Sequence, residues 1–366
     1  MRAPLPVSVL TGFLGSGKTT LLNRLLKDPA LVDTAVIINE LGDVAIDHLL
    51  VENSSDGVIE LAGGCICCTV RGDLVDTLSG LIDGVVDGSL GHLKRIVIET
   101  TGLADPVPVL QSIMGHPALV DALRLDGVIA AVDAVNFAAT LARHPEAARQ
   151  IAVADRIVLT KTDLATPEQT SEIDGLLRQL NAGAPVVDAA AGGASVAALF
   201  DCGLFNPATK TADVAAWLRD EALHQAEHHH GHAHPHDHHH DHHSRVRTFS
   251  LVHDRAVPFA AIETFLDLLR STHGDSILRM KGVIELAEDR ERPLVIHGVQ
   301  KLLHPPAHLA AWPAGPRGVR LVIIADGMPE DYVRRLFAAI TGQTGIGVPD
   351  RAAIEDNPLA IAGFRA

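Results

Sequence analysis

Eight residues near the start of the chain have the spacing of a phosphate-binding loop. Residues 12–19 read G-x-x-x-x-G-K-T, with an apolar, strand-like segment before them and helically spaced leucines after them. In such a loop, backbone N–H groups and the N-terminal end of the helix bind phosphate oxygens. Lys18 is expected to reach the β- and γ-phosphates, and the Thr19 hydroxyl to bind Mg²⁺. The predicted contacts to a nucleoside triphosphate come from Gly12, Gly15, Ser16, Gly17, Lys18, Thr19 and Thr20.

A second motif follows an apolar run at residues 96–98. The run ends in Glu99, whose carboxylate is expected to lie beside the Mg²⁺ held by Thr19 and to bind it directly or through water. The backbone N–H of Gly102 is expected to sense the γ-phosphate. Because phosphoryl transfer depends mostly on positioning and charge neutralisation, the predicted catalytic residues are Lys18, Thr19 and Glu99, and no side chain is singled out as a general base.

A third motif, Thr160-Lys161-Thr162-Asp163, predicts that the base is guanine. The carboxylate of Asp163 can accept hydrogen bonds from both N1–H and the 2-amino group of guanine, while Lys161 lies along the base. Adenine offers neither donor in that arrangement and would leave Asp163 unpaired in a desolvated pocket. A solvated Lys/Asp turn is the alternative, but the phosphate-binding loop favours a site for GTP, with Thr160, Lys161 and Asp163 on the base side.

Three of the four cysteines lie within four residues, at Cys65, Cys67 and Cys68. This spacing suits metal ligands better than a disulfide framework. Thiolates favour Zn²⁺ or Cu(I), with Co²⁺ as a further candidate in a tetrahedral site. Packing of three small side chains in a core is the alternative, since free cysteine is often buried.

The three thiolates can converge on one ion only if the backbone turns at the cluster. In a regular strand, Cys67 and Cys68 would point to opposite faces. The two glycines that precede the cluster permit such a turn. A fourth ligand is expected from Glu40, His116 or water.

Together these motifs resemble the CobW-type metallochaperone GTPases. The segments that carry the resemblance are residues 12–19, 39–40, 64–68, 99–102 and 160–163, and the similarity covers most of residues 5–342. The resemblance implies a GTPase that carries a transition metal, often zinc and in some members cobalt, to a client protein. Leu41 and Asp43 stand where the family has Phe and Glu, and Thr160 replaces the Asn that opens the guanine motif.

A coupling between nucleotide and metal follows from this arrangement as a hypothesis. Glu40 and Asp43 lie on a loop that the γ-phosphate and Mg²⁺ would order, so GTP is expected to assemble the metal site and hydrolysis to loosen it. Slow intrinsic hydrolysis, stimulated by a partner, is expected. A P-loop kinase for a small molecule and a metal storage or sensing protein with incidental hydrolysis are the alternatives, and cobalt delivery for cobalamin synthesis is a variant of the main interpretation.

The composition excludes several other classes of function. A formal net charge of −15 argues against nucleic acid or an anionic membrane as partner, because both favour a basic surface. No apolar run approaches the roughly 20 residues of a membrane span. The chain enters a strand without a signal-peptide pattern, and its clustered thiols indicate a reducing compartment, so we expect a cytoplasmic protein. The expected partners are GTP, the metal ion and a client, with a nucleotide- or metal-dependent dimer as a further option.

The order of apolar segments predicts two domains separated by a histidine-rich linker. Strands expected at 34–40, 58–61, 92–99, 125–133, 154–161 and 184–188 alternate with helical patterns, which indicates an α/β P-loop GTPase domain with a mainly parallel sheet over residues 1–223. Residues 224–244 contain 12 of the 21 histidines and are expected to be a disordered linker that buffers divalent ions. Residues 245–342 predict a smaller C-terminal α+β domain, and 343–366 a tail.

Overall fold

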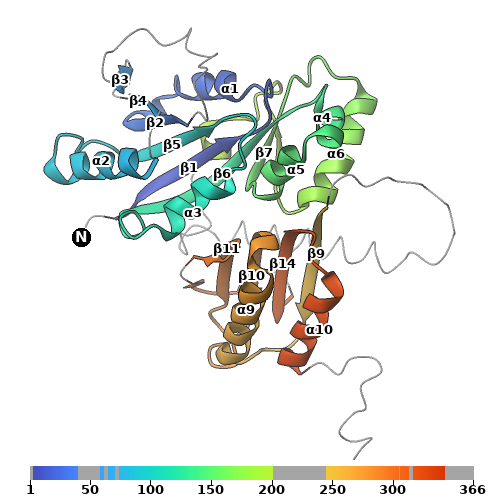
Figure 1. Ribbon diagram of the computed structural model, residues 1–366. Coiled ribbons are helices and arrows are strands. Elements are labelled where there is room, and N and C mark those ends of the chain that lie inside the picture. Colours follow the sequence, from blue (N-terminus) through green and yellow to red (C-terminus); the bar gives the residue numbers. More distant parts are fainter. Residues whose placement is uncertain are drawn as a thin grey trace, which may run out of the picture.

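A computed structural model describes residues 3–39, 58–61, 65–70, 74–200, 245–304, 306–312 and 316–342. Figure 1 shows a large mixed layer of strands and helices with a smaller sheet domain below it. The last part of the predicted first domain (201–223), the histidine-rich linker and the tail lie outside the described residues. Among the helices that are described, none is long and apolar enough to cross a bilayer.

The larger domain is built on an eight-stranded sheet in the order β3-β4-β2-β5-β1-β6-β7-β8. Every neighbouring pair is parallel except β3 and β4, which are antiparallel. The strands are β1 (Leu5–Thr11), β2 (Thr34–Asn39), β3 (Val58–Leu61), β4 (Cys65–Val70), β5 (Arg95–Thr100), β6 (Leu123–Asp133), β7 (Arg156–Thr160) and β8 (Val186–Asp188). The predicted α/β class with a mainly parallel sheet is therefore confirmed.

Helices cover both faces of this sheet, because its central strands are apolar on both sides. In β5, Ile96 and Ile98 pack in the cluster that contains α2 and α3, whereas Val97 packs with α1. A capping box formed by Thr166 and Gln169 starts α6. The helices are α1 (Lys18–Leu25), α2 (Leu74–Asp87), α3 (Val107–Gly115), α4 (Phe137–Arg143), α5 (Pro145–Ala152), α6 (Pro167–Asn181) and α7 (Val196–Leu199), with a 3₁₀ turn η1 (Pro29–Leu31) after α1.

The cysteine cluster itself is extended, and the two glycines before it lie outside the described residues. Residues Cys65–Val70 form strand β4, which pairs in parallel with β2 and antiparallel with β3. The backbone of Cys67 is level with that of Val36, and Cys68 with Ile37. The sequence C-I-C-C-T-V is β-favouring, and two neighbouring strands supply backbone partners, so the segment is extended instead of turned.

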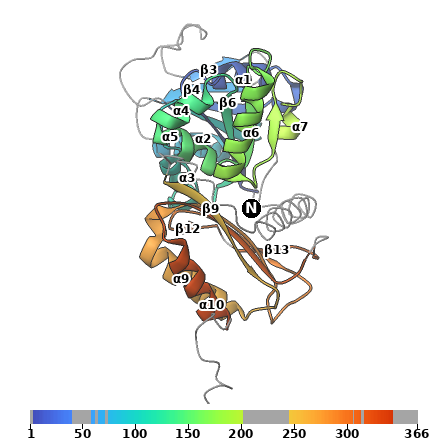
Figure 2. The same ribbon diagram turned by 90° about the vertical axis from the view of Figure 1, so that its right-hand side faces the viewer.

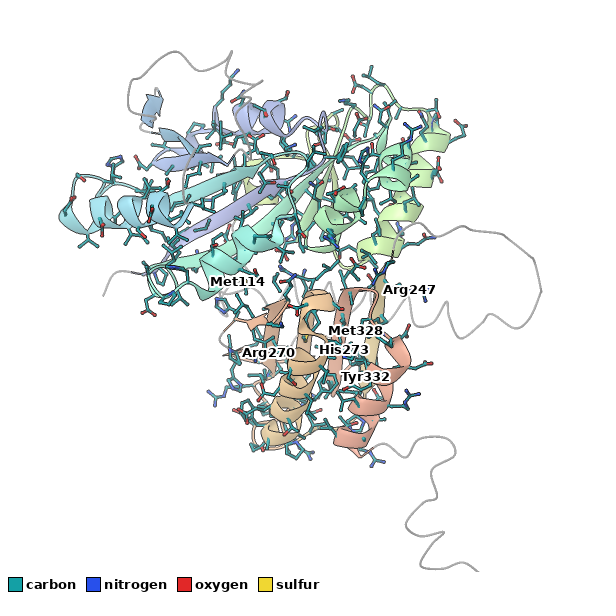
Figure 3. The ribbon with its side chains drawn as sticks, in the orientation of Figure 1. Met114, Arg247, Arg270, His273, Met328 and Tyr332 are labelled. Carbon is teal, nitrogen blue, oxygen red and sulfur yellow. The ribbon has the colours of Figure 1, made fainter. Side chains whose placement is uncertain are left out.

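The C-terminal domain is a six-stranded antiparallel sheet in the order β12-β11-β10-β14-β9, with β13 beside β11. Figure 2 shows that its two long helices lie on one side of the sheet. On that side His273 of α9 and Tyr332 of α10 are neighbours (Figure 3), with ring centroids 4.8 Å apart. The elements are β9 (Val246–His253), α9 (Phe259–His273), η3 (Gly274–Ser276), β10 (Ile277–Ile284), β11 (Leu294–Val299), β12 (Leu302–Leu303), β13 (Ala307–His308), β14 (Val319–Asp326) and α10 (Glu330–Thr341).

The two domains share apolar contacts. Leu278, Val299 and Ile324 of the C-terminal domain belong to the same buried cluster as the strands and helices on the α3 face of the large sheet. Met114, near the end of α3, packs against this cluster and lies at the level where the domains meet (Figure 3). Arg247, on β9, lies at the same level (Figure 3). The core is therefore continuous from one domain into the other.

Ionic contacts lie at the same interface. Asp155, just before β7, pairs with Arg279 at 2.5 Å and with Lys281 at 3.0 Å, both from β10. Its second oxygen accepts a hydrogen bond from the backbone N–H of Val128 at 3.0 Å. Burial alone would raise the pKa of Asp155, but the two cations outweigh it and hold that pKa well below its usual range.

Candidate nucleotide site

The phosphate-binding loop connects the end of β1 to the start of α1. Gly12 and Gly17 have φ of +140° and +86°, a region that favours glycine. A Cβ at Gly12 would overlap the carbonyl oxygen of Ala131 on β6, so only glycine fits there. The Oγ of Ser16 is buried and has no hydrogen-bond partner among the described residues, which leaves a polar group free for a ligand. Thr20, by contrast, is exposed on α1.

Lys18 folds its ammonium group back onto the loop. Its Nζ donates to the carbonyl oxygens of Gly12 at 2.8 Å and Phe13 at 3.1 Å. The side chain is buried, with 7% of its surface exposed. A cation held at this point lies where the motif places the phosphates, so the loop has the positive charge that phosphate binding requires.

Thr19 and Glu99 meet at the base of the loop. The Thr19 hydroxyl donates to Oε1 of Glu99 at 2.7 Å. The contact arises because β1 and β5 are neighbouring parallel strands, with Leu10 level with Glu99. A hydroxyl and a buried carboxylate are hard oxygen ligands, so this donor set fits Mg²⁺.

Gly102 lies against the phosphate-binding loop. A Cβ at this position would be 2.6 Å from the backbone nitrogen of Leu14, so the two backbones approach more closely than any side chain allows. On its other side, the carbonyl oxygen of Gly102 accepts a hydrogen bond from Nε2 of Gln150 at 3.1 Å. The sequence analysis missed Gln150, because a glutamine in a short helix carries no signal of such a contact.

Thr160 joins the base-side motif to the phosphate-binding loop. Its Oγ1 donates to the carbonyl oxygen of Ser16 at 2.7 Å and lies 3.1 Å from that of Val132. A threonine hydroxyl thus makes this connection at the position where Asn was expected. The contact brings the two motifs, 144 residues apart, into one site.

Lys161 contacts a carboxylate that the sequence analysis did not predict. Its Nζ lies 2.7 Å from Oδ2 of Asp133, at the end of β6. Burial would raise the pKa of Asp133, but hydrogen bonds from Lys161, Asn136 and the backbone of Val135 outweigh it and lower that pKa. Lys161 itself has φ of +57°, which turns the chain sharply before Asp163.

Asp188, at the end of β8, holds the base-side loops together. Its Oδ1 accepts hydrogen bonds from the hydroxyl of Thr162 at 2.8 Å and from the backbone N–H groups of Ala190 and Ala191 at 2.8 and 3.2 Å. These hydrogen bonds outweigh burial and lower the pKa of Asp188. Asp163 is exposed beside this corner and is open to a ligand.

Arg24 connects α1 to the same corner. Its guanidinium donates to the carbonyl oxygens of Ala189 at 2.9 Å and Ala194 at 3.2 Å. The helix that begins at the phosphate-binding loop therefore also fixes the loop after β8. Arg24 lies outside the motifs and was not predicted from the sequence.

A pocket of about 230 Å³ lies beside the phosphate-binding loop, between it and helices α4 and α5. Its walls combine apolar side chains with Asp133, Gln150 and Lys161. The pocket shares Gly15 and Ser16 with the loop, so it is continuous with the nucleotide site.

The residues predicted for the transition metal are less well placed by the structure. Glu40 lies outside the described residues, and Cys65, Cys67 and Cys68 are placed by their backbone in β4. His116 is exposed in the turn after α3, before the start of β6, and its Nδ1 lies 3.3 Å from the backbone nitrogen of Ala118. β2, which precedes Glu40, ends at the opposite edge of the sheet from this turn. Within the described residues, no group of three His, Cys, Asp or Glu side chains could hold a metal ion.

The fold and the joined motifs define the class of P-loop nucleotide-binding proteins. Within that class, the model of the CobW/HypB/UreG nucleotide-binding domain matches residues 6–188, and the model of the cobalamin synthesis protein cobW C-terminal domain matches residues 246–341. The chain therefore belongs to the CobW/HypB/UreG family and has the CobW C-terminal domain. This confirms the family resemblance of its motifs.

The relatives that the chain matches are similar over both domains. The zinc chaperone YjiA of Escherichia coli (strain K12) is 32% identical over 341 residues, which are 92% of this chain and 99% of that protein. The zinc chaperone CobW of Sinorhizobium sp is 30% identical over 371 residues, 93% of this chain and 98% of that protein. The crystal structure of Zn(II)-bound YjiA GTPase from E. coli aligns with a TM-score of 0.68 at 30% identity, covering 93% of this chain and 99% of that one.

Proposed function

We propose that the protein is a GTP-hydrolysing metallochaperone that binds a transition metal, zinc in the first place, and passes it to a client protein. The single observation that carries the GTPase part is the hydrogen bond from Thr160 to Ser16, because it joins a guanine-type motif to a phosphate-binding loop. The metal part rests on family membership and on relatives that are named zinc chaperones.

In this proposal each residue of the phosphate side has a separate role. Lys18 binds the β- and γ-phosphate oxygens, and the backbone N–H of Gly102 marks the position of the γ-phosphate. Thr19 and Glu99, already 2.7 Å apart, would hold Mg²⁺. When bound, that ion supplies positive charge to the phosphate oxygens. The buried Oγ of Ser16 is a further contact for a phosphate oxygen.

On the base side, Asp163 reads guanine while its neighbours hold it in place. Thr162 is held by Asp188 and Lys161 by Asp133, so the two residues before the exposed Asp163 are fixed in place. A rigid carboxylate discriminates more strongly between guanine and adenine, because it does not relax to satisfy the wrong base.

We propose Cys65, Cys67 and Cys68 as thiolate ligands of the cargo metal, with Glu40 as a further ligand and His116 as a weaker candidate. Convergence of all three thiolates requires the end of β4 to leave its regular strand geometry. Because Cys65 and Cys67 share one face of a regular strand, metal binding by all three thiolates includes a local change of the backbone between Cys67 and Cys68, with zinc favoured and Co²⁺ as an alternative ion. A reducing compartment, the cytoplasm, keeps these thiols available.

GTP and the metal are proposed to strengthen each other's binding. A ligand that orders the loop after β2 would place Glu40, and by thermodynamic reciprocity the metal must tighten GTP binding by the same factor. Hydrolysis then weakens the metal site and allows transfer to the client.

The test is to measure Zn²⁺ affinity with Mg·GTPγS, with Mg·GDP and without nucleotide, in the wild type and in Cys67→Ala. Cys202→Ala, which removes the thiol outside the cluster, is the matched control. The proposal expects the tightest binding with GTPγS, a large loss in Cys67→Ala and none in Cys202→Ala. Equal Zn²⁺ affinity in all three nucleotide states would contradict the coupling, and a phosphorylated product in place of free phosphate would indicate a kinase.

A further inference from the structure

Two consecutive residues of α5 contact the segment that follows β5. Gln150 is buried, with 1% of its surface exposed. Its side-chain amide donates to the carbonyl oxygens of Gly102 and Ala104, both at 3.1 Å. The two hydrogens of one amide group therefore hold two points of the loop that carries the predicted γ-phosphate sensor.

Arg149, the preceding residue, connects the same loop to the other domain. Its guanidinium lies 3.4 Å from Oδ2 of Asp105 and 2.9 Å from Oδ2 of Asp326. Asp105 starts α3 by accepting a hydrogen bond from the backbone N–H of Val107, whereas Asp326 ends β14 in the C-terminal domain. One side chain thus bridges the loop after β5 and the second domain.

The loop has little room to move independently of these contacts. Besides its contact with Gln150, Gly102 lies against the backbone of Leu14 in the phosphate-binding loop. A γ-phosphate that meets the N–H of Gly102 acts on a segment held at Gly102 and Ala104 by Gln150 and at Asp105 by Arg149. Any displacement of the segment must stretch those hydrogen bonds or carry α5 with it.

We propose that Gln150 and Arg149 are positioning residues for the γ-phosphate: Gln150 sets the position of Gly102, and Arg149 links that position to the C-terminal domain through Asp326. This inference rests on the proposed GTPase function and assigns its regulation to α5. The C-terminal domain, and whatever binds to it, then affects the preference of the nucleotide site for GTP over GDP, and the nucleotide affects the C-terminal domain by the same factor.

The experiment measures GTPγS and GDP affinity, kcat and KM for GTP, and the melting temperature of the full chain. Gln150→Met keeps the volume but loses both amide donors, and Asp326→Asn keeps the shape but loses the charge. We expect Gln150→Met to weaken GTPγS binding about tenfold and GDP binding less than about twofold, because two hydrogen bonds that position the sensor are lost. Asp326→Asn should weaken GTPγS binding about threefold with GDP unchanged.

Two controls separate positioning from a general loss of structure. Asp174→Asn removes an exposed carboxylate that pairs with Arg178 on α6, away from the loop, and should change none of the nucleotide affinities. The double variant Gln150→Met/Asp326→Asn tests the link, because residues of one network give a combined effect that differs from the sum of the single effects.

The outcomes are distinguishable. If GTPγS and GDP affinities fall together with the melting temperature, or do not change, the positioning role is overturned. If the two single effects add in the double variant, the link through Arg149 is overturned while the role of Gln150 stands. If the wild type binds no guanine nucleotide, the proposed function itself fails, and the inference fails with it.

Discussion

The two edges of the large sheet use charged residues in opposite ways. At the edge where the parallel strands end, Lys18 and Glu99 contact the phosphate-binding loop, and Lys161, paired with Asp133, lines the pocket beside that loop. At the edge where the strands begin, Asp155 is enclosed by Arg279 and Lys281 of the second domain. The first edge is organised to receive a ligand, and the second to join two domains.

The difference shows that burial of charge alone does not identify a functional site. Asp155, before the start of β7, and Asp133, at the end of β6, both have a pKa lowered against the effect of burial, yet the contacts of Asp155 are structural. Asp133 lies in a pocket wall with Gly15, which has a positive φ, and Ser16, whose buried hydroxyl has no hydrogen-bond partner among the described residues. Open polar groups next to a shaped cavity are the better signal.

The largest expected effect is on stability, at the edge of the sheet where the strands begin and the two domains meet. Asp155→Asn should lower the free energy of unfolding by about 3–5 kcal/mol, because Arg279 and Lys281 remain buried without their carboxylate. Urea denaturation followed by circular dichroism measures this change, and GTP affinity of the folded variant should be unaltered. Glu330→Gln, in an exposed pair with Arg334, is the control and should cost less than about 1 kcal/mol.

The same carboxylate predicts a dependence on pH. The pKa of Asp155 in the folded protein lies below its ordinary value of 3.8, so the stability that it contributes is present above that value and is lost as pH falls toward the folded pKa. The difference in free energy of unfolding between the wild type and Asp155→Asn should therefore be constant from neutral pH down to about 4 and shrink below it. If the difference in free energy of unfolding already shrank at pH 6, a group other than Asp155 would be responsible for the pH dependence.

At the edge where the parallel strands end, a substitution should lower activity more than stability. Lys18→Ala should reduce GTP hydrolysis about 100- to 1,000-fold, because a charged donor to the phosphates is lost. The free energy of unfolding should change by about 1 kcal/mol or less, since the ammonium donates hydrogen bonds to two neutral carbonyl groups of the loop. Phosphate release assays and urea denaturation check the two parts, with exposed Lys27→Ala as the control. If Lys18→Ala lowered stability as much as activity, the edge that receives the ligand would not differ from the edge that joins the domains.

Base recognition should respond at Asp163. Asp163→Asn should weaken GTP binding about 100-fold, because the carboxylate that accepts from guanine N1–H and the 2-amino group becomes an amide. Xanthosine triphosphate, which has a carbonyl in place of that amino group, should gain affinity relative to GTP. Competition titrations with GTP, xanthosine triphosphate and ATP measure the change. Unaltered GTP affinity would show that the base binds elsewhere.

The smallest effect is expected at Arg24. Arg24→Ala removes two hydrogen bonds to the loop after β8 and should weaken GTP and GDP binding about threefold each. The two nucleotides should respond alike because the loop lies on the base side, unlike Gln150 at the phosphate side. Arg178→Ala on α6 is the matched control. A selective loss of GTP would place Arg24 in the phosphate network instead.

The sequence predicts the fold and the nucleotide motifs well, because both depend on local patterns. A run of apolar residues marks each central strand, and the glycines and the lysine of residues 12–19 are contiguous. Parallel strand order then brings Thr19 to Glu99 with no further information. Strand ends are less certain: the strand expected at 92–99 begins at Arg95, since residues before it form a turn.

The contacts that the sequence does not predict join distant segments through common residue types. Gln150 and Gly102 are 48 residues apart, and nothing in the composition of α5 marks one glutamine as buried. The extended backbone of the cysteine cluster escapes the sequence for a related reason. Two glycines permit a turn, but pairing with β2 and β3 decides the backbone, and pairing is a tertiary effect.

Leu278, Val299 and Ile324 belong to the core of the larger domain although β10, β11 and β14 carry them. A truncated chain that stopped after residue 200 would leave the partners of these three side chains in water, together with the carboxylate of Asp155. Heating should therefore melt both halves in a single cooperative transition. Nucleotide binding by the larger domain then depends on the presence of the C-terminal domain, so the protein should not be shortened at the histidine-rich linker.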